Sequence, residues 1–217
     1  MKIKTALYLA VKYLTTREKQ GKKSRNIVSA VVGVFLSLIP LVVVLEVANG
    51  MIEGITRRYI EVGTYHLQIK SYDSEIEEQA EQLINRLEKE SFITRVFPFV
   101  QGLGIIYSEQ ANTGVSVRGL PADFYSNDPA VRDYLTVSSG SFDLETGTSV
   151  LLSENVAHNL GVEVGDSVKL LTAKTIPGRP MILRPSTFTV KAVFTTGYHE
   201  LDALSVYIPL EKAKILF

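Results

Sequence analysis

Residues 27–45 read IVSAVVGVFLSLIPLVVVL, a run of nineteen positions without a charged side chain. Fourteen of the nineteen are Val, Ile, Leu or Phe. At about 1.5 Å of rise per residue, a helix of this length spans roughly 28 Å, which is close to the hydrocarbon thickness of a bilayer. The run therefore predicts a transmembrane helix and a membrane-anchored protein.

The charge around this run predicts its orientation. The first 25 residues hold eight Lys and Arg against one acid, Glu18, which gives a net charge of +7. The whole chain has a net charge of zero, so the remainder carries −7. The positive-inside rule then places the N-terminus in the cytoplasm and the larger region on the other side. A cleaved signal peptide is the alternative, but it requires a shorter basic region and a small residue where this chain has Glu46.

Hydrophobic periodicity divides the chain into four parts. Residues 1–25 form a basic cytoplasmic segment, in which Lys4 to Lys19 has the pattern of an amphipathic interfacial helix. A loose basic lead-in is the alternative for that stretch. Residues 26–48 form the transmembrane helix, residues 49–62 a helical extension beyond the membrane, and residues 63–217 an α+β domain.

Alternating strands and helices predict the mixed α+β domain. Tyr65 to Lys70 alternates with period two and predicts a half-buried strand. Thr187 to Phe194 alternates as well, which predicts that Phe188, Val190, Ala192 and Phe194 face one side. We also expect strands near 93–100, 103–107, 114–119, 149–152, 167–171 and 206–209. Helices are expected at 122–134 and 154–160, from the capping box at Ser74–Glu77 through Glu90, and from Leu210 onward.

The sequence contains no pattern of a catalytic or cofactor site. Cysteine is absent, which excludes thiol catalysis and Cys-based metal centres. His66, His158 and His199 lack the neighbouring ligands that a metal site requires. Neither a Walker loop nor a basic patch outside the first 25 residues is present. We therefore expect no catalytic residues, no metal, no cofactor bound by this chain and no nucleic-acid partner.

The segment between Leu171 and Thr187 is rich in proline and predicts a long loop. Because Pro lacks a backbone donor, we expect the segment not to pair as an inner strand. Its length is enough to suggest a function, and Arg and Met are enriched in protein contacts. A passive extension of a hairpin is the alternative. The candidate binding residues are Pro177, Gly178, Arg179, Pro180, Met181 and Arg184, with Pro185 following.

Several motifs occur in an order that resembles one family. Residues 44–51, VLEVANGM, are similar to the family sequence Val-Leu-Ser-Val-Met-Asn-Gly-Phe. Residues 160–168, LGVEVGDSV, match Leu-Gly-Val-x-x-Gly-Asp-x-Val, and residues 194–202 match Phe-x-x-Gly-Tyr-x-Glu-x-Asp. Residues 10–14, AVKYL, resemble its Leu-Arg-Tyr-Leu lead-in. The chain thus resembles the LolC/LolE permeases of lipoprotein-releasing ABC transporters, within the wider MacB/FtsX-like permease group. It departs from the pattern at Glu46, Ala48 and Met51.

The resemblance implies an inner-membrane protein with four membrane helices and one large periplasmic domain between the first two. This chain stops before a second helix. The implied partners are an ATPase subunit similar to LolD, which uses ATP and magnesium, and a second permease subunit, identical or a sister. A periplasmic chaperone similar to LolA, the lipoprotein substrates and membrane lipids complete the set.

The resemblance also implies two sites. The helical stripe of Val44, Ala48, Met51 and Ile55 would contact lipoprotein acyl chains, although ordinary helix packing is the alternative for each. The loop at 177–185 falls where LolC-type subunits carry a hook that grips the chaperone, with Pro177, Gly178, Arg179 and Arg184 matching loosely. The function expected is lipoprotein release. MacB-type efflux of another substrate and a single-span periplasmic binding module are the alternatives.

Overall fold

The structure is a computed structural model of the 217-residue chain. It describes residues 5, 8–9, 12, 23–70, 77–174 and 182–217. Most of the predicted interfacial helix from Lys4 to Lys19 lies outside these residues. The chain divides into two compact units, Met1–Gly54 and Ile55–Phe217, and each is described by itself. The division falls within the predicted extension at residues 49–62.

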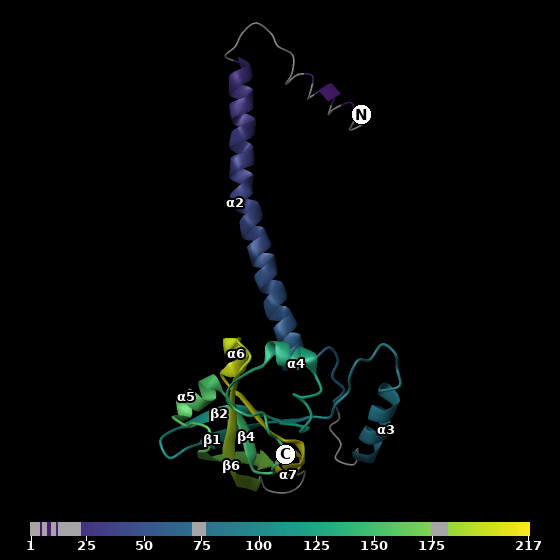
Figure 1. The fold of residues 1–217 in the computed structure, drawn as a ribbon, viewed down its shortest axis with the longest axis vertical. Helices are drawn as coiled ribbons and strands as arrows, with labels where there is room; N and C mark the ends of the chain where they lie inside the picture. The colour runs from purple at the N-terminus through teal and green to yellow at the C-terminus, as the bar shows by residue number, and fades with distance from the viewer. Residues whose placement is uncertain (1–4, 6–7, 10–11, 13–22, 71–76, 175–181) are drawn as a thin grey trace. The chain divides into compact units, whose positions relative to one another are not determined.

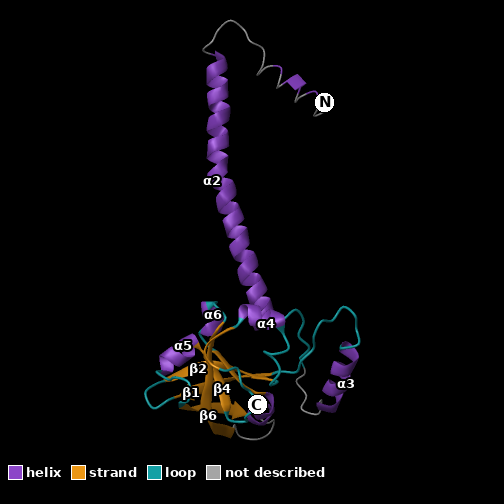
Figure 2. Cartoon of the chain, viewed as in Figure 1, coloured by secondary structure: helices purple, strands orange, loops and turns teal. Residues whose placement is uncertain are grey.

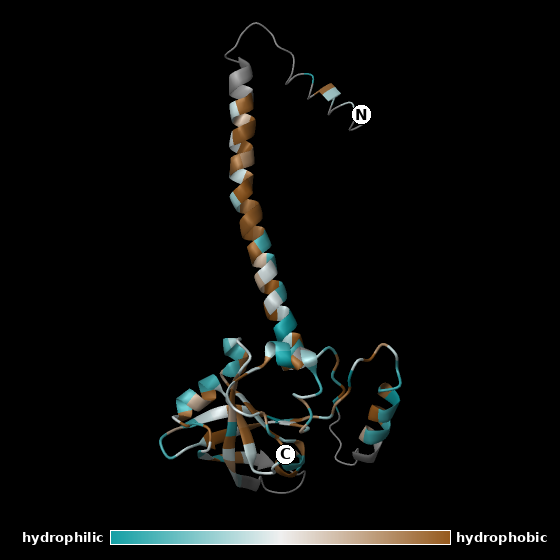
Figure 3. Cartoon of the chain, viewed as in Figure 1, coloured by the Kyte–Doolittle hydropathy of each residue, from teal (hydrophilic) through white to brown (hydrophobic). Residues whose placement is uncertain are grey.

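The long helix α2 runs from Lys23 to Arg58 (Figure 1). Its 36 residues correspond to a length of about 54 Å, well beyond the roughly 30 Å of a hydrocarbon core. The helix continues through Pro40, whose missing N–H removes one internal hydrogen bond. Its apolar window has a mean hydropathy of 2.8, and Figure 3 shows apolar residues giving way to polar ones toward the C-terminal end. By length and composition, α2 can cross a membrane, as predicted.

Beyond α2 the chain folds into a mixed α+β unit, as the periodicity predicted (Figure 2). The π-helical segment η1, Tyr59–Thr64, follows α2 directly. The strands are β1 Val100–Tyr107, β2 Asn112–Leu120, β3 Thr136–Gly140, β4 Ser149–Ser153, β5 Ser167–Lys174, β6 Ile182–Thr195 and β7 Ser205–Pro209. The remaining helices described are α3 Glu77–Leu87, α4 Pro129–Tyr134, α5 Glu154–Leu160, α6 His199–Asp202 and α7 Leu210–Leu216.

The seven strands form one sheet that closes on itself. Their order is β3-β6-β4-β7-β2-β1-β5, and β5 also pairs with β6. Strands β6, β4, β7, β2, β1 and β5 therefore make a complete ring, and β3 extends β6 beyond it. Two pairs, β2–β7 and β4–β6, are parallel, and the other pairs are antiparallel. Closure leaves few strand edges open to water, which lowers the risk of edge-to-edge association.

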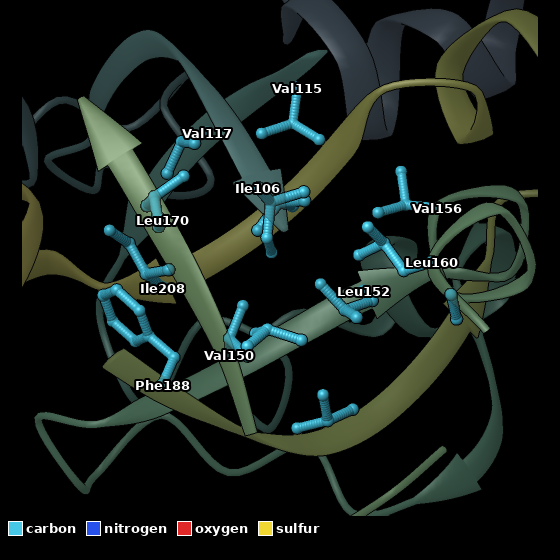
Figure 4. Close-up of a cluster of buried hydrophobic side chains, with 14 of the residues drawn as sticks. Ile106, Val115, Val117, Val150, Leu152, Val156, Leu160, Leu170, Phe188 and Ile208 are labelled. Carbon is cyan, nitrogen blue, oxygen red and sulfur yellow. The ribbon is translucent and has the colours of Figure 1, made fainter. Parts of the chain in front are cut away.

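Aliphatic side chains fill the inside of this ring (Figure 4). Ile106, Val117 and Ile208 are completely buried and come from three adjacent strands. Helices α5 and α7 contribute Leu160 and Leu216 to the same cluster. Fully burying each such side chain stabilises the folded state by about 1.5–3 kcal/mol, so this cluster is the main source of stability.

A second core packs on the other side of the sheet and is rich in aromatic residues. Phe124 is fully buried at its centre and meets Phe97 edge to face, with ring centroids 5.0 Å apart. Phe194 on β6 stacks on Tyr207 of β7 at 4.6 Å. Val62 of η1 is buried in this cluster. The aromatic core therefore joins the sheet to the segment that follows α2.

Strand β6 changes the core it faces at Lys191. Val150 of β4 pairs with Val190, whereas the next residue, Leu151, pairs with Ala192, so Lys191 is an extra residue in a β-bulge. Phe188 and Val190 accordingly lie in the aliphatic core, while Ala192 and Phe194 lie in the aromatic core. The prediction that all four face one side was wrong, because simple alternation does not reveal a bulge.

The helix predicted at 154–160 is confirmed as α5. Ser153 caps its N-terminus by accepting a hydrogen bond from the N–H of Val156, and Gly161 ends it in the left-handed conformation, at φ 65°. Asp166 then accepts a hydrogen bond from the N–H of Glu163 at 2.8 Å. Gly165 has φ 102°, a value that favours glycine. The turn from α5 into β5 thus depends on its two glycines and its aspartate.

The prediction of a long unpaired loop between Leu171 and Thr187 was wrong at both ends. Strand β5 continues to Lys174 and β6 begins at Ile182, and these two residues pair in an antiparallel hairpin. Arg184 is therefore a strand residue opposite Thr172. Residues 177–181 of the predicted binding loop lie outside the described residues.

Pro185 is compatible with β6 because of the side on which its nitrogen lies. The N–H of Val190 donates to Asp166 on the β5 side, and the N–H of Thr189 donates to Thr148 on the β4 side. Alternation places the nitrogen of Pro185 on the same side as that of Thr189. The pairing of β6 with β4 begins only at Thr189, so the ladder at Pro185 requires no donor from the proline.

Two other predicted strands are wrong. Residues 65–70 have no strand pairing, and the side chains of Leu67 and Ile69 are 78% and 59% exposed. Of the residues 93–100, only Val100 belongs to a strand. Alternating sequence is necessary for a half-buried strand, but it is not sufficient, because the strand also needs a partner.

We predict that a side chain at Gly119 destabilises the unit. A Cβ atom there would lie 2.2 Å from the Cβ atom of Ala213 on α7, so that Gly119→Ala should lower the free energy of unfolding by about 1–3 kcal/mol. Gly114→Ala on the same strand meets nothing within 4 Å and should change it by at most about 0.5 kcal/mol. Chemical denaturation in detergent measures both, and equal effects would contradict this packing.

Candidate functional site

The apolar stripe of α2 is the first candidate site. Val44, Ala48, Met51 and Ile55 follow one another at spacings of four, three and four, which places them on one face of the helix. All four residues lie on α2, so the helical conformation that places them on one face is confirmed. Val44 and Met51 are 64% and 63% exposed, so the stripe has no cover within the described chain. Isolated exposed apolar residues are common, whereas a continuous stripe is typical of a contact surface.

The face opposite the stripe is polar. Glu46, Asn49 and Glu53 follow one another along it at spacings of three and four. The helix is therefore amphipathic after its charge-free run, with one apolar and one polar face. An amphipathic helix of this kind can contact acyl chains on one face and water on the other.

Arg118 is a functional candidate that the sequence analysis missed. It lies on β2, and its guanidinium donates hydrogen bonds to the carbonyl oxygens of Val62 and Gly63, both at 2.8 Å. A helix leaves its last carbonyls without internal partners, and a cation near them is favourable. Arg118 therefore ends η1 and ties it to the sheet. In the sequence it is one polar residue of an alternating strand, so no pattern distinguished it.

Two further contacts join the start of η1 to the turn before α6. Arg58 donates a hydrogen bond to the carbonyl oxygen of Gly197 at 3.0 Å. Tyr59 meets Tyr198 edge to face, with ring centroids 6.4 Å apart. The residues matching the family's Tyr-x-Glu-x-Asp element thus lie against the segment that follows α2.

Asp202 fixes the turn that carries this contact. It is buried, and its carboxylate accepts hydrogen bonds from Thr195 Oγ1 at 2.7 Å and from Thr196 Oγ1 at 2.8 Å. The N–H of Thr196 donates to the same carboxylate at 2.9 Å. A buried carboxylate needs such donors, so the role of Asp202 is to hold the turn that presents Tyr198.

The three histidines provide no metal centre in the described part of the chain. His66 lies 3.7 Å from Glu61, and His199 Nδ1 lies 2.9 Å from the side-chain amide of Asn155. Within residues 23–70, 77–174 and 182–217, no three His, Asp or Glu side chains gather as ligands would. His199 and its acidic neighbours instead form the helical turn α6.

The long apolar helix α2 is followed by a mixed α+β domain with a closed sheet. This combination defines the class of protein as a membrane-anchored domain. The chain belongs to the family of the MacB-like periplasmic core domain, whose model matches residues 28–217. The predicted membership of the wider MacB-like permease group is thereby confirmed.

Curated relatives agree with this assignment. The chain is 24% identical over 200 residues to the lipoprotein-releasing system transmembrane protein LolC of Xylella fastidiosa, which covers 89% of this chain and 46% of that protein. It is 24% identical over 213 residues to LolC of Haemophilus influenzae, covering 95% of this chain and 51% of the relative. The chain thus spans about half the length of these relatives.

A solved structure is also similar. The extracellular domain of the noncanonic ABC-type transporter YknZ from Gram-positive bacteria has a TM-score of 0.44 and 17% sequence identity to this chain. The similarity covers 62% of this chain and 64% of that one.

We predict that stability falls at alkaline pH because of Tyr207. Burial raises the pKa of its hydroxyl, since the charged phenolate loses its hydration in the aromatic core. The folded pKa lies above the unfolded value of about 10, so this stability is present below pH 10 and is lost as the pH rises beyond it. Tyr207→Phe should flatten the fall in unfolding free energy above about pH 10. An unchanged slope in the variant would contradict the prediction.

Proposed function

We propose that this protein is a permease subunit of an ABC transporter that releases lipoproteins from the inner membrane to a periplasmic chaperone. The similarity to LolC and the family of the domain support this assignment. The basic first 25 residues support a cytoplasmic N-terminus with the domain in the periplasm.

The observation that carries the proposal is the exposed apolar stripe on α2. Its charge-free run ends at Leu45, and Ala48, Met51 and Ile55 continue the stripe over about 15 Å of helix beyond that point. A lipid anchor that leaves a bilayer exposes its acyl chains, at a cost of about 0.8 kcal/mol for each CH₂. An apolar face that projects from the membrane lowers that cost during extraction.

In this proposal the chain performs no covalent chemistry. A separate ATPase subunit binds ATP and magnesium, and a second permease subunit, identical or a sister, completes the membrane part. This chain supplies the first span, the stripe and the folded domain. Movement of the helices would then open and close the apolar surface to the lipoprotein.

Export of another substrate, as in MacB-type efflux permeases, is the alternative. The match to the MacB-like periplasmic core domain favours it as much as lipoprotein release, because that domain defines the wider family. The chemical nature of the substrate that binds to the stripe distinguishes lipoprotein release from efflux.

We predict that a photo-crosslinking side chain at Met51 or Ile55 captures acylated lipoprotein in native membranes. The same side chain at Asn49 or Glu53 should capture little, because these positions lie on the polar face and acyl chains contact the apolar face. Both sets of positions lie on the same helix, so the comparison tests the face alone. Mass spectrometry of the adducts measures the difference. Capture of a non-lipidated export substrate would support the efflux alternative, and equal capture on both faces would contradict the stripe.

We further propose that the β5–β6 hairpin binds the chaperone through Pro177, Gly178, Arg179, Pro180, Met181 and Arg184. The register of the hairpin supports this, because residues 175–181 connect two strands that pair as far as Lys174 and Ile182. Paired strands provide a rigid base for a binding loop, which lowers the entropy lost on binding.

We predict that Arg179→Ala or Pro177→Ala weakens the capture of a LolA-like chaperone in a pull-down from membranes. Arginine is enriched among interface hot spots, whose truncation costs about 2 kcal/mol or more of binding energy. Lys191→Ala, at the bulge in β6, is the matched control and should bind as the wild type does. Equal capture by all these variants would remove the hairpin from the chaperone site.

A further inference from the structure

Tyr65 has an unusual backbone conformation directly after η1. Its φ is 58° and its ψ is 170°, and among the described residues it is the one non-glycine residue with a positive φ. This region of conformational space is essentially reserved for glycine, so a bulky aromatic residue there is strained. The preceding segment is π-helical, a rare form that is often found at functional sites. The junction between α2 and the sheet therefore combines a rare helical form with a strained residue directly after it.

The side chain of Tyr65 is held on several sides. Its ring meets Phe97 edge to face at 4.9 Å, and it also contacts Phe99 and Phe124. The guanidinium of Arg118 lies 5.4 Å from the ring centroid and donates to the hydroxyl oxygen at 3.2 Å. The surrounding aromatic core thus over-determines the position of this ring.

Arg118 connects Tyr65 to the end of η1. The same guanidinium that binds the Tyr65 hydroxyl also holds the carbonyl oxygens of Val62 and Gly63. It therefore fixes the backbone just before Tyr65 and the side chain of Tyr65 itself. A planar guanidinium presents its donors in a fixed fork that suits these three acceptors, whereas an ammonium is a compact charge without that geometry.

Arg95 provides an internal comparison. It also donates to two carbonyl oxygens, of Asp123 and Phe124, and it lies over the rings of Phe97 and Phe124. It has an ion pair with Asp128 at 3.3 Å. The two arginines thus make the same kinds of contact in the same aromatic core, but only Arg118 binds η1.

We propose that Arg118 is a positioning residue that holds Tyr65 and η1 in a strained conformation, from which the junction relaxes when the arginine releases it. The junction is then an element with two states, at the point where the C-terminal end of α2 enters the domain. This inference does not depend on the transported substrate or on the transport function.

The strain can be measured with a double-mutant cycle. Tyr65→Gly and Tyr65→Ala remove the same ring, so their difference reports only the backbone preference at that position. With Arg118 present, the glycine variant should be the more stable, because glycine accepts a positive φ. In an Arg118→Gln background this advantage should vanish or reverse, because the relaxed backbone no longer needs glycine. An equal advantage in both backgrounds, or none in either, would overturn the proposal.

Hydrogen exchange on the full chain in nanodiscs tests the release itself. Arg118→Gln should speed amide exchange at residues 61–66 by about tenfold or more while β4 and β7 keep their wild-type rates. Arg95→Gln should leave residues 61–66 unchanged and speed exchange near residues 123–128. Arg118→Lys, which retains the charge, should give an intermediate effect and serves if the glutamine variant fails to fold. Uniform acceleration across the sheet would show a merely structural arginine and reject the proposal.

Discussion

The pairing of β6 with three other strands is the constraint on which the domain depends. Its first half pairs with β5 and its second half with β4 and β3, so one strand closes the ring and also extends it. The bulge at Lys191 makes this possible, because it turns the second half of the strand toward the aromatic core. Without that extra residue, Ala192 and Phe194 would point toward the aliphatic core. Strands β4 and β7 reach both cores by simple alternation, whereas β6 supplies its large side chains to both because of the bulge.

The aromatic core has a second role because two arginines are built into it. Aromatic faces attract guanidinium groups, and buried guanidinium groups need carbonyl acceptors. Arg95 and Arg118 meet both requirements with backbone carbonyls, and Arg118 takes its carbonyls from the end of η1. Arg118, one of the two arginines of this core, thus also attaches the segment following α2. Stability of the domain and attachment of its helix share one set of interactions.

The sequence allowed prediction of those features that depend on local physics. The charge-free run predicted α2, and the helix predicted at 154–160 has the bounds of α5, because hydrophobic length and helical pattern act within a few residues. The strand at 65–70 and the side toward which Ala192 faces were wrong, because both depend on a distant partner strand. Arg118 was missed for the same reason, since its partners are more than fifty residues away. Of the candidate sites, the shared helical face of the stripe follows from residue spacing and its role from the family resemblance, whereas the junction follows from neither.

Pro185 limits how the open edge of β6 can pair with strands of other proteins. Over its first half, β6 turns one side away from β5, and no described strand pairs with that side before Thr189. A bare row of backbone donors and acceptors is a template for foreign strands. The proline removes a donor from the middle of this row, so an incoming strand cannot form a continuous ladder there. The pyrrolidine ring thereby disfavours edge-to-edge association along the first half of β6.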